Sequence, residues 1–364
     1  MELKIFNREL SLIGIIDSFS SLIWNRKYNS IGEFQLNILF TEENNSLLNL
    51  ENIIYKDNGE AGFITCKEIK IDDNGAETIE VKGKFIIGYL ERRIVWGCED
   101  INSNVVDASH QLIINNCIDC IDKRKIPNLS IEENKQINIP LIKRVSYDNL
   151  FDTLSSIAQT HELGLKVDFD IFAKKLIFKI YEGIDRSISQ KVTAPIIFSR
   201  EFENVLNQNY LESNSNHKNV ALIAGAGEGA DRKTTTIGDE NGLDRYELFV
   251  DARDIADTRY IDGENESIPN DEYRELLITR GYEKLAGQYK IKTFDSTINT
   301  NSNLIYKQDY DLGDIVTFFD KKWGFTIDTR ITEISEIYDI EGVTINITFG
   351  NNVPTLMDII KRKG

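Results

Sequence analysis

An unbroken alternation of apolar and polar residues near the end of the chain is the strongest constraint on its fold. In Val343–Phe349 (VTINITF) every second side chain is apolar, so an extended strand here has one apolar and one polar face. Ile315–Phe319 and Phe325–Ile331 are also strand-like, and residues 339–342 (DIEG) are typical of a turn. We therefore predict an antiparallel meander within residues 300–364.

The N-terminal hundred residues carry the same two-residue period. Gly32–Ile38, Ile64–Ile71 and Thr78–Lys82 alternate in this way, and the sequence DDNG at 72–75 is a strong hairpin turn between the last two. Further apolar stretches that could supply strands are Leu12–Ile16, Leu22–Trp24 and Phe85–Leu90. These segments predict a first β-barrel or sandwich over residues 1–100.

Residues 101–195 have a different pattern, which predicts an α+β unit. Ser103 can cap a helix whose apolar residues are Val105, Val106, Leu112, Ile113 and Cys117. A second helix is expected from about Ser146 to Gly164, with helical spacing of Leu150, Phe151, Leu154, Ile157 and Ala158. Leu165–Phe169 and Leu176–Ile180 then alternate as a hairpin.

Strand patterns return after residue 195. The segments NVALIAG (219–225), KTTTIG (233–238) and RYELFVDARDI (245–255) are strand-like, whereas residues 257–270 are polar and rich in turn formers. Residues 271–289 predict a helix that buries Tyr273, Leu276, Leu277 and Leu285. We expect 196–256 to begin a second barrel, 257–299 to be an insertion containing the helix, and 300–364 to complete the barrel. The fold class is thus β-rich α+β.

Charge and cysteine content exclude several classes of protein. The net charge of −17 argues against a general nucleic-acid binder, which needs a basic face. Since no apolar run approaches the roughly 20 residues that span a bilayer, we expect no membrane insertion. Cys117 and Cys120 form a CxxC pair, but a zinc site would need a second pair of ligands close by. Small buried thiols in a reducing cytoplasm are the interpretation we favour.

The stretch ALIAGAGEGADRKT (221–234) resembles a phosphate-binding loop. However, Gly225, Gly227 and Gly229 give GxGxG instead of GxGxxG, and three threonines follow where a dinucleotide site needs a helix. No Gly-Lys-Ser/Thr closes a Walker loop either. We predict a strand, a wide turn and a second strand, and we keep a nucleotide-binding loop as the alternative.

No catalytic constellation emerges from the titratable residues. We expect His161 to close the second helix and His217 to be an exposed loop residue, and His110 is isolated from other potential ligands. The acidic residues gather in what we interpret as solvated turns, at Asp72–Asp73, Asp239–Glu240, Asp262 with Glu264, and Asp309 with Asp311. We therefore propose no catalytic, cofactor-binding or metal-ligating residue, and no enzyme activity.

Four stretches in order resemble the tail-hub proteins of tailed bacteriophages, and in particular the siphovirus-type hub family, which is similar to the N-terminal hub part of tail-tip and tail-associated proteins. They are IGIIDSFSSLIWNRKYNSIGEFQLNI, NVALIAGAGEGADRKT, DRYELFVDARDI and DYDLGDIVTFFDKKWGFTIDTRITEISEIYD. The resemblance implies a hub-like fold with two tube-forming β-barrel-like domains and smaller α+β domains. It also implies a homotrimer that forms a pseudo-sixfold ring continuing the hexameric tail tube.

The resemblance further implies a baseplate or tail-tip hub within the virion, a prophage tail or a tail-like bacteriocin, assembled in the bacterial cytoplasm. Its partners would be the tail-tube or distal tail protein, a central spike or fibre and the tape-measure protein, and DNA would only pass through its channel. Because the sequence ends shortly after the last predicted strand, we expect spike or lytic activity on another chain. Two alternatives stay open, an enzyme acting on nucleotides or glycans and a carbohydrate-binding protein for host attachment.

Overall fold

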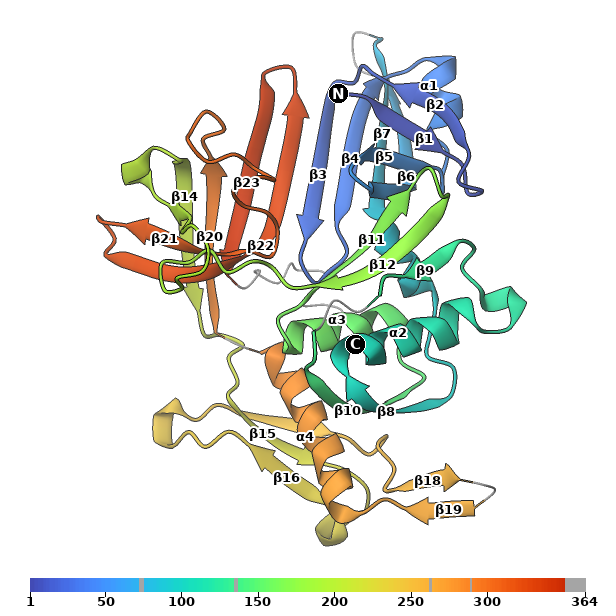
Figure 1. Ribbon diagram of the computed structural model, residues 1–364, viewed down its shortest axis with the longest axis vertical. Coiled ribbons are helices and arrows are strands. Elements are labelled where there is room, and N and C mark those ends of the chain that lie inside the picture. Colours follow the sequence, from blue (N-terminus) through green and yellow to red (C-terminus); the bar gives the residue numbers. More distant parts are fainter. Residues whose placement is uncertain (72–74, 134–136, 262–263, 289, 351–364) are drawn as a thin grey trace.

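One large, mainly antiparallel sheet carries both the first and the last of the described strands (Figure 1). The computed structural model describes residues 1–71, 75–133, 137–261, 264–288 and 290–350. Within these residues the sheet has the order β14-β20-β23-β22-β3-β4-β7-β6-β5-β1-β2. Outside this path, β21 pairs with β22, and β13 pairs with β21. Its two halves, which are far apart in the sequence, meet where β3 pairs antiparallel with β22.

The N-terminal half of the sheet forms largely where the alternation predicted it. Its strands are β1 Leu3–Phe6, β2 Leu12–Ile16, β3 Ser21–Lys27, β4 Glu33–Leu39, β5 Ile53–Asp57, β6 Glu60–Ile71 and β7 Glu77–Phe85, with helix α1 at Glu42–Leu47. The stretch predicted as a strand at Phe85–Leu90 is instead mainly a 3₁₀ helix, η1, at Ile86–Arg92. The prediction rested on the apolar run alone. Ile86, Ile87 and Leu90 are all buried, and such a run fits a 3₁₀ helix as well as a strand. Residues 72–74 of the predicted turn lie outside the described residues.

The C-terminal half contains the predicted meander. Its strands are β13 Ile197–Phe198, β14 Val205–Ser213, β20 Ile291–Ile298, β21 Ile315–Asp320, β22 Phe325–Asp339 and β23 Gly342–Gly350, with a 3₁₀ turn, η4, at Arg200–Phe202. Each half of the sheet carries its own buried apolar cluster. Trp24, Phe34 and Leu36 belong to the N-terminal cluster, and Phe294, Phe318 and Phe349 belong to the C-terminal one.

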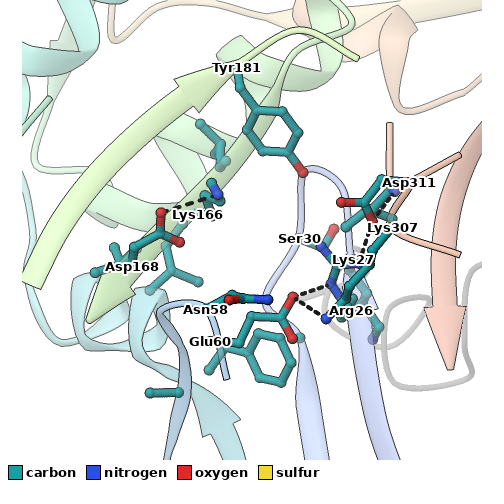
Figure 2. A pocket seen from close by; sticks show the side chains of 17 residues that line it. Arg26, Lys27, Ser30, Asn58, Glu60, Lys166, Asp168, Tyr181, Lys307 and Asp311 are labelled. Atoms are coloured by element: carbon teal, nitrogen blue, oxygen red, sulfur yellow. Dashed lines mark hydrogen bonds and ion pairs between the residues drawn. The ribbon is translucent and has the colours of Figure 1, made fainter. Parts of the chain in front are cut away.

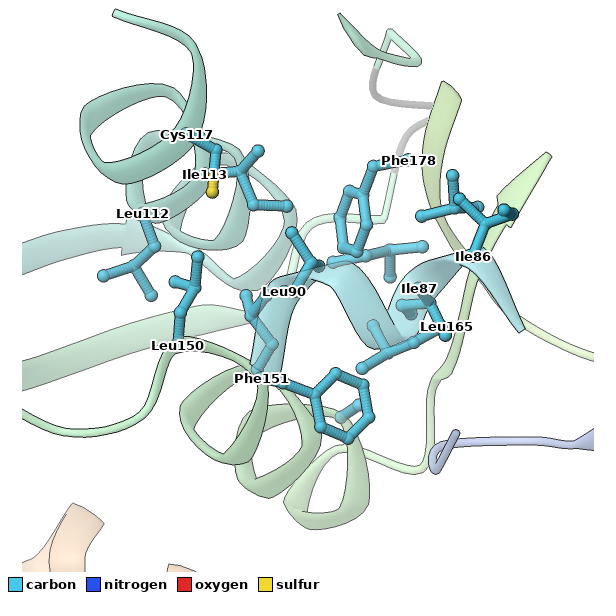
Figure 3. Close-up of a cluster of buried hydrophobic side chains, with 14 of the residues drawn as sticks. Ile86, Ile87, Leu90, Leu112, Ile113, Cys117, Leu150, Phe151, Leu165 and Phe178 are labelled. Carbon is cyan, nitrogen blue, oxygen red and sulfur yellow. The ribbon is translucent and has the colours of Figure 1, made fainter. Parts of the chain in front are cut away.

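The α+β unit packs below the N-terminal half of the sheet (Figure 1). Its elements are β8 Cys98–Asn104, α2 Val105–Ile113, a π-helical turn η2 at Ile114–Ile118, η3 Asp122–Arg124, β9 Leu129–Ile131, β10 Pro140–Ser146, α3 Leu150–Thr160, β11 Gly164–Asp170 and β12 Lys175–Tyr181. Apolar residues of α2, α3, η1 and β11–β12 form one core (Figure 3).

Both predicted helices of this unit are present, but their caps differ from the prediction. Ser103 and Ser146, where we expected the two helices to begin, lie in strands β8 and β10. The residues that cap the helices are asparagines. The Asn104 side chain accepts hydrogen bonds from two backbone N–H groups of α2, and Asn149 does the same for α3. Asparagine satisfies the free N–H groups at a helix start as well as serine does. The hairpin β11–β12 is confirmed.

A second small unit corrects the predicted extent of the second barrel. Strands β15 Val220–Ala224, β16 Thr234–Ile237 and β17 Glu247–Asp251 form a separate three-stranded sheet. Helix α4, Asn270–Ala286, packs on it, and Tyr273, Leu276 and Leu277 enter the shared core. Residues 220–251 therefore lie outside the large sheet, whereas β20, expected in the insertion, pairs within it.

The remaining elements of this small unit are short. They are η5 Gly229–Asp231, η6 Gly242–Asp244 and the hairpin β18 Thr258–Ile261 and β19 Glu264–Ser267. The hairpin falls in the segment that we expected to be turns, where polar residues masked the strand pattern. Taken together, the described elements confirm the predicted β-rich α+β class.

Candidate functional site

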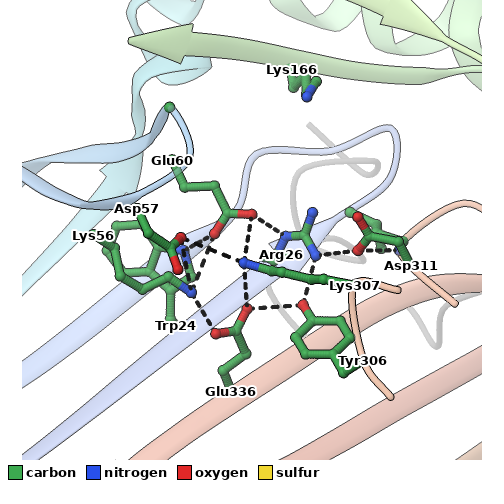
Figure 4. A network of polar contacts seen from close by, with 12 residues as sticks. Trp24, Arg26, Lys56, Asp57, Glu60, Lys166, Tyr306, Lys307, Asp311 and Glu336 are labelled. Carbon is green, nitrogen blue, oxygen red and sulfur yellow. Dashed lines mark hydrogen bonds and ion pairs between the residues drawn. The ribbon is translucent and has the colours of Figure 1, made fainter. Parts of the chain in front are cut away.

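A set of polar side chains, six of them charged and most of them largely buried, lies where the two sheet halves meet (Figure 4). We call it the polar junction; its members are Arg26, Lys56, Glu60, Tyr306, Lys307, Asp311 and Glu336. Arg26 comes from β3 and Glu336 from β22, the two strands that join the halves, and β5, β6 and the 306–311 segment supply the others. The junction thus separates the two apolar clusters.

Lys56 is the centre of the polar junction. Its side chain is 0% exposed and pairs with Glu336, which is 2% exposed, and with Glu60 at 3.3 Å. The ammonium also lies 5.4 Å from the centre of the Trp24 ring and 5.7 Å from that of Tyr338, where cation–π attraction contributes. The two carboxylates and the two rings replace the water that the Lys56 ammonium loses on burial.

Glu60 links β6 to β3 and to the 306–311 segment. It accepts hydrogen bonds from the Trp24 indole at 3.1 Å and pairs with Arg26 at 2.8 Å and with Lys307 at 3.4 Å. Burial would raise the pKa of Glu60, but the neighbouring cations outweigh burial and lower the pKa to about 2. Glu60 is therefore an anion throughout the physiological range.

The 306–311 segment closes the junction from the C-terminal half. The Arg26 guanidinium donates to the Tyr306 hydroxyl at 2.6 Å and to Asp311 at 2.5 Å, and Tyr306 donates to Glu336 at 2.9 Å. Burial raises the pKa of Tyr306, so the phenol stays protonated. Burial would also raise the pKa of Glu336, but Lys56 and Lys307 reverse this and lower it.

The contacts of the polar junction connect the two sheet halves, and they do not form an arrangement typical of an active site. The neighbouring cations lower the pKa of Glu60 and of Glu336, and each of these two acids already has two or more partners. A general acid or base would need a carboxyl pKa shifted toward neutrality. The arrangement instead fixes the register of β3 on β22, because a shifted pairing would leave these charges buried without partners.

A cavity of about 240 Å³ lies beside the junction, between the sheet and the α+β unit (Figure 2). Arg26, Glu60 and Lys307 line one wall, and Lys166, Asp168 and Tyr181 line the other. The charges pair within each wall: Asp168 lies 3.2 Å from both Lys166 and Lys179. Since the paired groups do not converge on a common point, we assign no ligand to the cavity.

The glycine stretch is a turn between two strands, as predicted. β15 and β16 pair antiparallel on either side of it, and Gly227 has φ +102°. Two of its N–H groups have partners within the small unit: Gly225 N–H donates to Lys233 O at 2.8 Å, and Ala226 N–H donates to the hydroxyl of Tyr273 on α4 at 2.7 Å. The Arg232 guanidinium donates to the carbonyls of Ala224 and Gly225. The N–H groups of Gly225 and Ala226 are thus used within the protein, whereas those of a phosphate-binding loop point at the ligand.

The other candidate residues are scattered. Only Cys117 of the four cysteines is buried, and Cys66 and Cys98 are exposed, which corrects the expectation of buried thiols. Burial raises the pKa of the Cys117 thiol to about 12, so it is not a reactive thiolate. Among the residues that the structure describes, no group of three or more His, Cys, Asp or Glu side chains could hold a metal ion.

His161 caps the end of α3 as predicted, but burial lowers its pKa, which opposes the positive charge expected there. Burial also lowers the pKa of His110, which packs against Phe178. His217 is half-buried beside Tyr246 and not exposed. Asp311 belongs to the polar junction instead of a solvated turn, whereas residues 72–73 and 262 lie outside the described residues. No helix in the described ranges is long and apolar enough to cross a membrane.

A sequence signal for the polar junction was present, but we did not use it. Glu336 lies two residues from Ile334 and from Tyr338, so all three share one face of β22. Lys56 shares a face of β5 with Ile54 in the same way. A charge at an inward position of a strand predicts a buried partner. The identity of that partner depends on pairing across about 280 residues, which alternation does not reveal.

Comparisons with known proteins identify one family and a fold shared with solved structures. The profile described as Siphovirus ReqiPepy6 Gp37-like protein matches residues 2–351. No curated protein matches. Among solved structures, the tail protein from Neisseria meningitidis MC58 is similar with 12% identity and a TM-score of 0.59, over 96% of this chain and 97% of that one.

Two further solved structures agree. The prophage MuSo2 43 kDa tail protein from Shewanella oneidensis has 14% identity and a TM-score of 0.59, over 96% of this chain and 98% of its own. Prophage tail protein gp18 from Listeria monocytogenes EGD-e has 12% identity and a TM-score of 0.55, over 100% and 98%. At these identities the likeness shows a shared fold, and it extends over the whole of both chains.

Proposed function

The chain belongs to the Siphovirus ReqiPepy6 Gp37-like family of phage tail proteins, and on this premise we propose that it is the hub of a phage or phage-like tail. Three copies would form a ring that adapts the hexameric tail tube to a central spike or fibre. The ring would form part of the channel through which DNA passes. The protein would catalyse no reaction and would act within the virion, after assembly in the bacterial cytoplasm.

The observation that carries this proposal is the extent of the family match. It spans residues 2–351, so it includes both sheet halves and both smaller units in one continuous stretch. The fold supports the same role, because each chain offers two sheet halves, each with its own apolar cluster, on one sheet. Three such chains would supply six similar units to meet a sixfold tube.

The polar junction is consistent with this role because it ties the two halves of the sheet together. A hub has to keep its two halves at a fixed angle while the tube and the spike pull on either side. Buried ion pairs between Lys56, Glu60 and Glu336 specify one register for β3 and β22, and Arg330 further ties the C-terminal half to Glu162 of the α+β unit. The partners we propose are the tail-tube or distal tail protein, the spike or fibre, and the tape-measure protein.

Electron microscopy of tail particles carrying a labelled copy of this chain tests the proposal. We expect the label at the end of the tail tube, and a particle mass that corresponds to three copies per tail. A label along the length of the tube, or particles that lack the chain, would overturn the hub assignment. A copy number of six would keep the tail role but refute the trimer.

A further inference from the structure

A groove of about 510 Å³ lies between the α+β unit and the last turns of helix α4. Leu141 and Ile142 of β10 line one side, and Tyr282 and Leu285 of α4 line the other. Tyr282 is 54% exposed, so part of its apolar surface has no cover within the described residues. A concave site of this volume with apolar walls is typical of sites that bind small molecules or peptide side chains.

The groove also carries an acidic side chain without a counter-ion. Two carboxylates line it, and one of them, Glu283, pairs with Lys143 at 2.5 Å, where both side chains are almost fully buried. The other, Glu275, is exposed, and no cation of the described residues forms an ion pair with it. The groove therefore suits a binding partner that is both apolar and positively charged.

The last described strand ends near the α4 side of the groove. β23 ends at Gly350, which pairs across the sheet with Thr293 near the start of β20. Thr293 follows Ala286, the last residue of α4 and a lining residue of the groove, by seven positions, and seven residues span at most about 25 Å. Figure 1 shows α4 pointing from the small unit toward the large sheet.

Gly350 is also connected to the α3 side of the groove. The Thr332 hydroxyl donates to Gly350 O at 2.6 Å, and Tyr28 N–H donates to Thr332 O at 3.0 Å. The Tyr28 hydroxyl in turn donates to Glu162 O at 3.1 Å. Glu162 directly follows His161, the residue that caps α3 and lines the groove. The end of β23 thus lies close to both sides of the groove.

The residues that follow Gly350 have the composition that the groove suits. Residues 351–364, NNVPTLMDIIKRKG, lie outside the described residues. They contain two apolar pairs, LM at 356–357 and II at 359–360, followed by the cations KRK at 361–363. From Gly350, the chain up to the second apolar pair spans up to about 35 Å, which is enough to reach the groove.

We infer that residues 351–364 bind in the groove of their own chain, with the apolar pairs against Tyr282 and Leu285 and the cations near Glu275. Bound there, the segment contacts β10, α3 and α4 together, and it holds the small unit against the α+β unit. Attachment to the end of β23 keeps the segment at a roughly millimolar effective concentration, so weak contacts suffice. The family profile ends at residue 351, and the inference does not depend on the proposed hub.

A labelled synthetic peptide with the sequence of residues 351–364 tests the inference. Fluorescence anisotropy measures its binding to the full chain and to a chain truncated after Gly350, and circular dichroism confirms that the truncated chain is folded. We expect the peptide to bind the truncated chain about tenfold more tightly, because the tethered segment occupies the groove of the full chain. Equal binding to both chains, or no binding to the truncated chain up to about 1 mM peptide, would overturn the inference.

Charge reversal locates the binding surface. Glu275→Lys in the truncated chain should weaken binding of the peptide about fivefold, because the cations of the peptide then meet a lysine. The matched control is Glu266→Lys, which makes the same charge change at an exposed position of β19 that does not line the groove. The control should leave the affinity unchanged. If both variants weaken binding equally, or neither does, the peptide binds elsewhere and the groove assignment is wrong.

Proteolysis of the full chain gives a measurement that does not require the truncated chain to fold. Trypsin cleaves after the cations at 361–363, and mass spectrometry gives the rate. Thr279→Lys places a long cation in the groove and should raise this rate about tenfold by displacing the segment. Asn265→Lys, which adds the same charge at an exposed position of β19, should leave the rate unchanged.

Two results of these measurements would contradict the inference. Equal cleavage rates in the parent protein and in folded Thr279→Lys would show that the segment does not bind in the groove. A dimer of the full chain that the truncated chain does not form would place the segment on a second copy instead of its own chain.

Discussion

The polar junction and the glycine turn at 225–229 are opposites in sequence and in structure. The turn is conspicuous in the sequence and resembles a ligand site, yet Gly225, Ala226 and Arg232 form hydrogen bonds within the same small unit. The junction is inconspicuous in the sequence, yet it brings six charged side chains together between the two halves of the main sheet, and Lys56 and Glu336 among them are almost fully buried. The glycines therefore shape one local turn, whereas the charged residues of the polar junction connect the two halves of the sheet.

The physical reason for the difference is the surrounding medium. An exposed turn exchanges its hydrogen bonds with water at little net cost. A buried charge that loses its partner has no water to replace it, so the cost is several times larger. Mutations in the two regions should therefore differ in size, and the following predictions test that difference.

Removal of the Lys56 charge should have the largest effect. Lys56→Met keeps the contact with the Trp24 and Tyr338 rings but leaves Glu60 and Glu336 short of a cation in a buried place. We expect the free energy of unfolding to fall by roughly 3–5 kcal/mol, measured by denaturant titration. The matched control is Lys82→Met, because Lys82 forms an exposed pair with Glu80, and it should change stability by at most about 1 kcal/mol.

A double variant sharpens this prediction. Lys56→Met combined with Glu336→Leu removes both charges of the pair, so it should recover part of the lost stability. If Lys56→Met and Lys82→Met cost the same, the polar junction is not the joint that holds the two halves together.

Acid should weaken the junction, with the next largest effect. The pKa of Glu60 is about 2 in the folded protein against an ordinary 4.5. The unfolded chain therefore takes up the proton first as pH falls, and stability present above pH 4.5 is lost toward pH 2. At about 1.4 kcal/mol per pKa unit, the loss is roughly 3 kcal/mol. Unfolding at a series of pH values should show a shallower acid dependence in Glu60→Gln; an unchanged slope would contradict the assignment.

Alanine at the three glycines should have smaller, graded effects. Gly227 has φ +102° and a Cβ there would lie 2.7 Å from Asp231 O, so Gly227→Ala should cost the most, about 2 kcal/mol. At Gly225, a Cβ would lie 2.2 Å from the Tyr273 hydroxyl, which has to move. Gly229 has φ +54° in open space, and its replacement should cost about 1 kcal/mol.

The same glycine variants separate a turn from a ligand site. Because the N–H groups of Gly225 and Ala226 are already used within the protein and no helix follows the glycines directly, millimolar nucleotide should leave the melting temperature of the parent protein and of all three variants unchanged. A rise in the parent that the variants lose would restore the nucleotide-binding alternative.

Much of the secondary structure could be predicted because its signals are local. The alternation in residues 343–349 and the helical spacing of Leu150, Leu154 and Ile157 depend only on near neighbours in the chain. The strand–turn–strand at the glycines followed from the same reasoning. The errors occurred where local signals compete, as in Phe85–Leu90, where an apolar run fits a strand and a 3₁₀ helix equally well.

The sequence by itself determined most of the strands and helices, because the periods of 2.0 and 3.6 residues are properties of the local backbone. It did not determine that β15–β17 leave the main sheet, nor that Lys56 meets Glu336 across 280 positions. Those choices depend on which edges and which buried charges find partners in three dimensions. Only the tertiary structure decided them, since the energy of a buried ion pair belongs to the two residues together and to neither one alone.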